Sequence, residues 1–282
     1  MSTLDIPEIL RPDDRQARPL LISVPHSGTL FPDDERPLYR VPVDELLADG
    51  DLFVDQLYDG AETRGATVIR TPVNRFVVDL NRLEDDLSPR SVRGATRRRG
   101  EGYYGDRGLI WAVTTAGEDI YRRPLDPARL ERRLHRYYRP YHAALRRELF
   151  RLRERFGHAV LLDAHSMPSR ARAQHNDPVG RRRADIVPGD LEGRSCDSSL
   201  RRLIVDFWRQ RHYTVAPNRP YRGGGITRRH ADPTHRIQAI QLELRRGLYM
   251  DEEALQPHEG FPRLQQHCRE LVETLAEYVQ PR

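Results

Sequence analysis

Two histidines in this chain stand at the ends of apolar runs, where they could bind a metal ion. His26 follows the run at residues 20–25, and His165 follows the run at residues 159–164. Each run is typical of a short buried strand, and ligands in open α/β sheets bind beyond the carboxyl ends of such strands. Two imidazoles that meet at such an edge indicate a metal-dependent hydrolase, although a single histidine after a strand is more often structural.

A catalytic zinc site needs a third protein ligand and keeps one position open for water. Asp51 is the preferred third ligand and Asp49 the alternative, since both lie near His26 in sequence, at the start of a predicted helix. An aspartate at that place also commonly caps a helix. Asp163 lies two residues before His165, on the same face of a strand, and is expected to support the imidazole. The competing interpretation of Asp163 and His165 is a buried polar pair in the core.

Hydrolysis by an activated water also needs a general base that later acts as an acid. Glu243 is the candidate, because it lies inside an apolar strand, where a carboxylate is costly unless it is paired or functional. Gln241 shares its face if the strand is regular. The competing interpretation is an edge strand with Glu243 turned toward solvent.

Substrate recognition is assigned to an amide and several guanidinium groups. Asn81 and Arg82 directly follow a predicted strand, and such a pair suits a carboxylate. Arg75 and Arg228 are further candidates. Arg228 follows three consecutive glycines at 223–225, a flexible turn that lets the backbone approach a ligand.

These residues require an α/β fold with a central mixed sheet flanked by helices, in a single domain over residues 1–282. Alternating apolar runs and amphipathic segments support it. The predicted strands are residues 20–25, 67–71, 75–80, 159–164, 185–187, 213–216 and 237–244. The predicted helices are residues 44–47, 51–63, 126–156, 198–211 and 262–278.

Composition restricts the possible partners. The 282 residues carry a net charge of +5, all 47 basic residues are arginine, and two cysteines are too few for a disulfide framework. The arginine-rich segment 93–107 could contact nucleic acid, but a solvated loop is the simpler interpretation, and an anionic substrate also fits the basic balance. No stretch suits export or a membrane span, so a cytoplasmic location and no membrane partner are expected.

Several of these motifs together resemble the N-formylglutamate amidohydrolase (deformylase) family. They appear in the family's order over roughly residues 20–255. They are Val24-Pro25-His26-Ser27-Gly28, Asp49-Gly50-Asp51, the segment from Arg75 to Arg82, Asp163-Ala164-His165-Ser166, the segment from Gly223 to Arg228, the segment from Gln238 to Leu244, and Tyr249-Met250-Asp251-Glu252.

The resemblance implies a fold similar to zinc carboxypeptidases and aspartoacylase (phosphorylase/hydrolase-like). It also implies hydrolysis of N-formyl-L-glutamate to formate and L-glutamate, as in histidine degradation. One Zn²⁺, or another divalent ion, would be held by His26, Asp51 and His165, with Glu243 as the catalytic glutamate. A substrate with two carboxylates would explain separate arginine candidates. Thr29, at the HxxE position of carboxypeptidases, departs from that pattern.

Two alternatives to this function are kept. The first is a related metal-dependent enzyme that acts on another N-acyl amino acid or, like a carboxypeptidase, on a small peptide. The second, more distant one is a basic nucleic-acid-binding protein that uses the loop at 93–107. In the preferred reading the partner is a small N-acyl amino acid, and nucleic acid is not expected.

Overall fold

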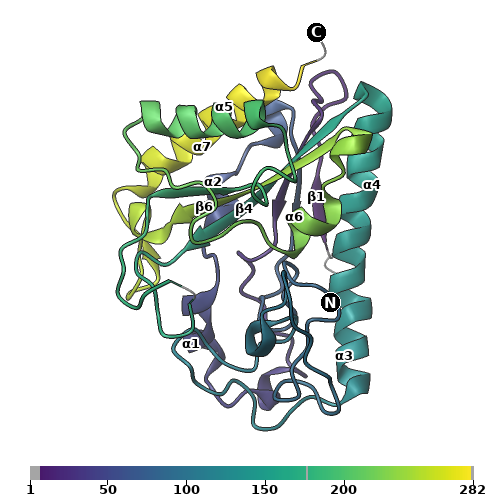
Figure 1. Cartoon of the computed structure of the whole chain (residues 1–282), viewed down its shortest axis with the longest axis vertical. Coiled ribbons are helices and arrows are strands. Elements are labelled where there is room, and N and C mark those ends of the chain that lie inside the picture. Colours follow the sequence, from purple (N-terminus) through teal and green to yellow (C-terminus); the bar gives the residue numbers. More distant parts are fainter. Residues whose placement is uncertain (1–6, 176, 281–282) are drawn as a thin grey trace.

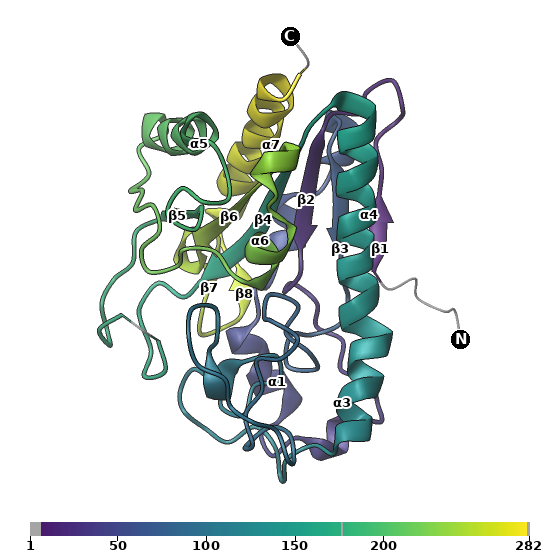
Figure 2. The same cartoon turned by 45° about the vertical axis from the view of Figure 1, so that its right-hand side comes forward.

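The structure is a computed structural model that describes residues 7–175 and 177–280. Its centre is a mixed sheet of six strands, flanked by helices (Figure 1). The strand order is β1-β3-β2-β4-β6-β5 (Figure 2). The four inner strands are parallel, and the edge strands β1 and β5 run antiparallel to their neighbours. The strands are β1 (Glu8–Leu10), β2 (Leu20–Val24), β3 (Thr67–Arg70), β4 (Ala159–Met167), β5 (Ile186–Gly189) and β6 (Ile237–Arg245), with a separate pair formed by β7 (Met250–Asp251) and β8 (Gln256–Pro257).

Helices cover both faces of this sheet, which confirms the predicted α/β class (Figure 2). One face packs against α2 (Val54–Leu57), α5 (Ser198–Gln210) and α7 (Phe261–Tyr278). The other packs against α3 (Pro127–Arg133) and α4 (Arg139–Phe156), which a π-helical turn joins into one long rod. Two short helices, α1 (Val43–Leu46) and α6 (Gly225–His230), lie near the carboxyl edge of the sheet. In the described residues, no helix is long and apolar enough to cross a membrane.

The inner strands alternate strictly between the two faces. On β4, Leu162 and Ala164 join the core under α5 and α7, whereas Leu161 joins the core under α4. Successive side chains of a strand point to opposite faces. Asp163 and His165 therefore share the α4 face with Leu161, and this face carries the polar groups at the carboxyl edge.

Three sequence predictions about local structure are wrong. Residues 75–80 form turns instead of a strand, because the Asn74 side chain accepts the Phe76 amide at 3.0 Å and caps a tight turn. The predicted helix at 51–63 is reduced to α2 and a 3₁₀ turn, since Phe53 has a left-handed φ of 66° that interrupts it. Residues 213–216 make only an isolated bridge at Val215.

A long irregular segment, residues 71–126, folds over the carboxyl edge and contains no named strand. Arg133 of α3 contacts this segment through the Val77 carbonyl and also forms a buried ion pair with Glu35, which lies outside the segment. Arg133 donates to Glu35 at 2.6 Å and to the Val77 carbonyl at 2.7 Å, and its side chain is inaccessible to solvent. Breaking such a pair leaves a buried carboxylate uncompensated.

We expect Arg133→Met to lower the free energy of unfolding by about 3 kcal/mol, because Glu35 would lose its buried partner. Urea unfolding followed by circular dichroism measures this loss. Arg132→Met removes a half-exposed arginine next to it and serves as the matched control. A loss no larger than that of the control would contradict the structural role of the pair.

Candidate metal and catalytic site

The register of β4 and β6 places four polar side chains side by side. His165 is directly opposite Glu243, and Asp163 is directly opposite Gln241. All four lie on the face covered by α4, since the neighbouring even-numbered residues of both strands pack in the opposite core. Gln241 donates to a carboxylate oxygen of Glu243 at 2.8 Å, which confirms that the two share a face. Glu243 thus lies in an inner strand and is buried.

His26 reaches the same edge from β2, which pairs with β4 in parallel. Its ring centroid lies 4.9 Å from that of His165. The Asp51 amide donates to the His26 carbonyl at 3.0 Å, so the two ends of the intervening loop are joined at the site. This backbone contact brings the Asp51 carboxylate between the two imidazoles.

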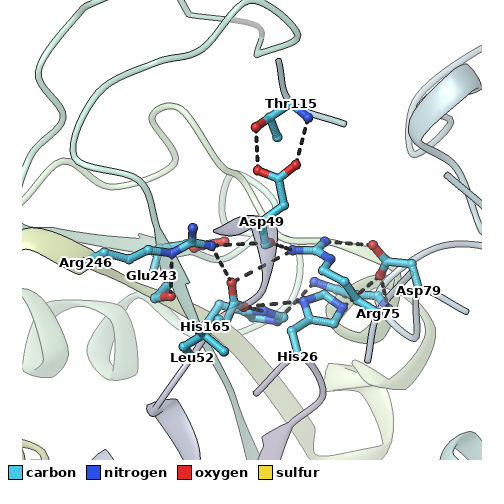
Figure 3. A network of polar contacts seen from close by, with 12 residues as sticks. His26, Asp49, Leu52, Arg75, Asp79, Thr115, His165, Glu243 and Arg246 are labelled. Carbon is cyan, nitrogen blue, oxygen red and sulfur yellow. Dashed lines mark hydrogen bonds and ion pairs between the residues drawn. The ribbon is translucent and has the colours of Figure 1, made fainter. Parts of the chain in front are cut away.

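One potential ligand atom from each of these three residues lies close to those of the other two. Figure 3 shows His26 and His165 next to each other in this group. Asp51 Oδ2 lies 3.0 Å from His165 Nδ1 and 3.4 Å from His26 Nδ1. The three potential ligand atoms lie within 4.8 Å of one another, and all three residues are buried. Two imidazole nitrogens and one carboxylate oxygen form a donor set of the kind found in catalytic zinc sites.

The outer nitrogens of both imidazoles face carboxylates. His26 Nε2 lies 2.8 Å from Asp79 Oδ1, and His165 Nε2 lies 3.0 Å from Asp163 Oδ2. A proton on His26 Nε2 leaves the Nδ1 lone pair of that ring directed inward. His165 Nε2 also lies 3.1 Å from the Asn81 amide nitrogen, and His165 Nδ1 lies 3.0 Å from Asp51 Oδ2. His26 Nδ1 is buried and has no hydrogen-bond partner among the described residues. A buried acceptor of this kind suits a metal ion.

The charges of the ionisable groups in this three-residue site also suit a bound cation. Burial alone would raise the pKa of Asp51, but the hydrogen bond from His165 and the charges of His26 and Arg75 hold it well below the usual range. Burial alone would lower the pKa of His165, yet Asp163 and Asp51 raise it well above the usual range. Asp51 is therefore an anion, and a cation would compete with the proton on His165.

The pKa of Glu243 is shifted in the opposite direction from that of Asp51. Burial raises the pKa of Glu243 to about 7, with the charge of Asp51 adding to the rise and that of His165 opposing it. Two neighbouring carboxylates with separated pKa values are a common sign of an acid–base site. This carboxylate can therefore take up and release a proton near neutral pH.

Asp49, the alternative third ligand, lies outside the metal group. Its carboxylate accepts the Thr115 amide at 2.8 Å (Figure 3) and pairs with Arg172 at 3.0 Å. It fastens the irregular segment to the edge of the site instead of facing the imidazoles.

A cavity of about 370 Å³ opens onto these groups. Its polar lining combines the metal group and Glu243 with many arginines. Asn81 is in the lining, but its carboxamide is already engaged by Gln241 at 3.1 Å, His165 at 3.1 Å and the Ile226 amide at 2.8 Å. It is placed to position the site instead of binding a carboxylate directly.

The three arginines named from the sequence all line the cavity but differ in their partners. Arg75 donates to Asp79 at 2.7 Å, and Arg228 donates to Glu101 at 2.9 Å. Arg82 donates to two backbone carbonyls and is paired with no carboxylate among the described residues. Of these three arginines, Arg82 is therefore the most available to bind an anion.

Sequence reasoning missed Asp79, Arg107, Trp111 and Arg246. Arg246 donates to the second oxygen of Asp51 at 3.1 Å, and Trp111 donates to Asp79 at 2.9 Å. The sequence did contain a signal that Asp79 belongs to the site, because Asp79 lies only two residues before Asn81. It was hidden because residues 75–80 were interpreted as a strand.

Carboxylates already neutralise part of the arginine-rich segment 93–107. Arg97 pairs with Asp106, and Arg98 pairs with Asp85 at 3.1 Å. Glu101, in the same segment, forms an ion pair with Arg194 at 2.5 Å. These pairs favour a structural role over nucleic-acid binding.

Comparisons with known proteins agree on one family. The model of the N-formylglutamate amidohydrolase family matches residues 18–250. The chain is 38% identical over 237 residues to the N-formylglutamate deformylase of Pseudomonas putida, with 83% of this chain and 82% of the relative covered. A protein of the same name from Pseudomonas aeruginosa is 37% identical over 240 residues, with 84% of each chain covered.

One solved structure supports the same family, and a second supports the fold. The crystal structure of an N-formylglutamate amidohydrolase from Ralstonia eutropha JMP134 has a TM-score of 0.89 at 36% identity, covering 97% of this chain and 98% of its own. A gene product of Agrobacterium tumefaciens shares the fold, with a TM-score of 0.64 at 21% identity and coverage of 92% and 90%.

Proposed function

The chain belongs to the N-formylglutamate amidohydrolase family, and on this premise we propose that it hydrolyses N-formyl-L-glutamate to formate and L-glutamate. It is a hydrolase that acts on an amide. The observation that carries the proposal is the buried group of His26, Asp51 and His165 beside Glu243, a carboxylate with a raised pKa. We further propose that the fold is related to zinc carboxypeptidases, and that the enzyme serves histidine degradation in the cytoplasm.

The proposed metal is one Zn²⁺ or a similar divalent ion, held by His26, Asp51 and His165. When bound, it would act as a Lewis acid that polarises the formyl carbonyl and lowers the pKa of water. Asp79 and Asp163 would keep the two imidazoles in the tautomer that binds through Nδ1. Arg246 would hold the second oxygen of Asp51 and so fix the orientation of this carboxylate.

Glu243 is the proposed general base and acid. Its carboxylate accepts a proton as water adds to the formyl carbon, and then delivers that proton to the amide nitrogen as the C–N bond breaks. A pKa near 7 suits both directions of transfer. Gln241, which donates to Glu243 at 2.8 Å, would keep the carboxylate directed along the sheet face.

Arg82 is the proposed partner of a substrate carboxylate, because its planar fork suits a bidentate contact and no carboxylate of the described residues is paired with it. Arg75 and Arg228 line the same cavity, and each already has a protein carboxylate as partner. We propose that they contribute positive potential, and that Asn81 positions Arg82 and His165.

Purified protein is expected to release formate from N-formyl-L-glutamate, and to lose this activity on chelation and regain it with Zn²⁺. N-acetyl-L-glutamate and N-formyl-L-methionine are the comparison substrates, and formate or free amine is the readout. Faster turnover of N-acetyl-L-glutamate would favour a related N-acyl-amino-acid amidohydrolase. Activity that survives complete removal of metal would contradict the proposed metal site.

A further inference from the structure

Six arginines line the cavity, and they divide by whether a protein carboxylate neutralises them. Four have a carboxylate partner within ion-pair distance, and two have none among the described residues. The neutralised ones are Arg75 with Asp79, Arg222 with Glu192, Arg228 with Glu101 and Arg246 with Asp51. The cavity therefore keeps two uncompensated positive charges, those of Arg82 and Arg107.

These two arginines are joined to each other and share an aromatic support. Arg82 Nε donates to the Arg107 carbonyl at 2.9 Å. The guanidinium carbons lie 5.8 Å (Arg82) and 5.5 Å (Arg107) from the ring centroid of Trp111, and that of Arg82 lies 3.9 Å from the ring of Tyr104. Stacking of this kind orients a planar guanidinium and leaves its N–H edge for a ligand.

The guanidinium of Arg107 has fewer polar contacts than that of Arg82. The Arg107 guanidinium makes no hydrogen bond to the described residues, although it is only partly exposed. Burial, together with the charge of Arg82, lowers the pKa of Arg107 to about 10. Two unpaired cations in one partly desolvated cavity repel each other, and an anion with two charges would relieve that repulsion.

We propose that Arg107 determines specificity by binding the side-chain carboxylate of the substrate, while Arg82 binds the α-carboxylate. The inference rests on the proposed hydrolysis of N-formyl-L-glutamate and assigns the residue that recognises the acidic side chain of that substrate. The two carboxylates of N-formyl-L-glutamate match the two uncompensated charges. Arg75 and Arg228 fit this role less well, because a substrate would have to compete with Asp79 or Glu101.

The decisive comparison uses N-formyl-L-glutamine, which has nearly the shape of N-formyl-L-glutamate but no side-chain charge. Wild-type enzyme is expected to prefer the glutamate substrate by about 100-fold in kcat/KM. Arg107→Gln is expected to remove most of that preference. It should lower kcat/KM for N-formyl-L-glutamate by about 100-fold, mainly through KM, and change that for N-formyl-L-glutamine by less than about fivefold.

Arg222→Gln is the matched control, because it removes an arginine from the same lining whose charge Glu192 already balances. It should keep the preference for glutamate. Arg107→Lys retains the charge without the planar fork and should keep about a tenth of the preference. It is the variant to use if Arg107→Gln melts at a markedly lower temperature.

The outcomes separate this inference from the proposed function. If wild-type enzyme prefers N-formyl-L-glutamate and Arg107→Gln retains that preference, the assignment of Arg107 is overturned and the function stands. If wild-type enzyme releases formate from neither substrate, the proposed function fails, and the assignment of Arg107 fails with it.

Discussion

Glu243→Gln is expected to lower kcat for formate release from N-formyl-L-glutamate by about 10³-fold. The amide keeps the size of the side chain and can still pair with Gln241, but it cannot accept the proton of the attacking water. Metal binding should persist, since His26, Asp51 and His165 are unchanged. Steady-state kinetics and elemental analysis of the same preparation measure both quantities.

Glu253→Gln is the control, because Glu253 is exposed and lies outside the cavity. It should leave kcat within about twofold of wild type, as surface substitutions usually have small effects. A Glu243→Gln enzyme with kcat within tenfold of wild type would exclude Glu243 as the base.

The pH dependence of kcat/KM is a second way to test Glu243 as the general base. Glu243 must be ionised to accept a proton, so kcat/KM should fall as pH drops through its pKa. Burial raises that pKa to about 7 without metal, and the positive charge of a bound ion would lower it again. The acid limb of wild-type enzyme is therefore expected below pH 7. The residual activity of Glu243→Gln should lack this limb.

Asp51→Asn is expected to have the second largest effect, through loss of metal. It exchanges the anionic ligand for a neutral amide, and affinity for Zn²⁺ should fall by more than about 100-fold, the upper range seen for partners outside the ligand set. Competition with a fluorescent chelator measures the affinity, and formate release should fall in proportion to the metal lost.

Asp49→Asn is a close match to this variant, because it makes the same chemical change two residues earlier in the chain. Its carboxylate binds Thr115 and Arg172, so the substitution should lower the melting temperature while leaving Zn²⁺ bound. Loss of metal from Asp49→Asn, with retention by Asp51→Asn, would reverse the assignment of the third ligand.

Sequence periodicity was sufficient for the parts of the fold that bury apolar side chains. The strands around Leu162 and Leu242 and the helix after Asp126 follow directly from their patterns, and Asp126 accepts the Arg129 amide as expected for an N-cap. Because parallel strands end at a common edge, His26 and His165 could be expected to lie close together.

The rest depends on contacts between residues distant in sequence. Periodicity could not separate Asp49 from Asp51, since the difference arises from the hydrogen bond between the Asp51 amide and the His26 carbonyl. Arg107 lies in an irregular segment with no repeating pattern. Its importance comes from the absence of a carboxylate partner among the described residues, which is a property of three-dimensional packing alone.

The strict alternation along β4 and β6 separates two kinds of sequence variation. Leu162, Ala164, Leu242 and Leu244 point into the core beneath α5 and α7. Asp163, His165, Gln241 and Glu243 point to the opposite face, where His165, Gln241 and Glu243 line the cavity. A mutational library restricted to the even positions would therefore sample stability with the reactive groups unaltered. One restricted to residues 163, 165, 241 and 243 would sample chemistry on a constant core, so directed evolution can treat stability and reactivity as separate steps on the same two strands.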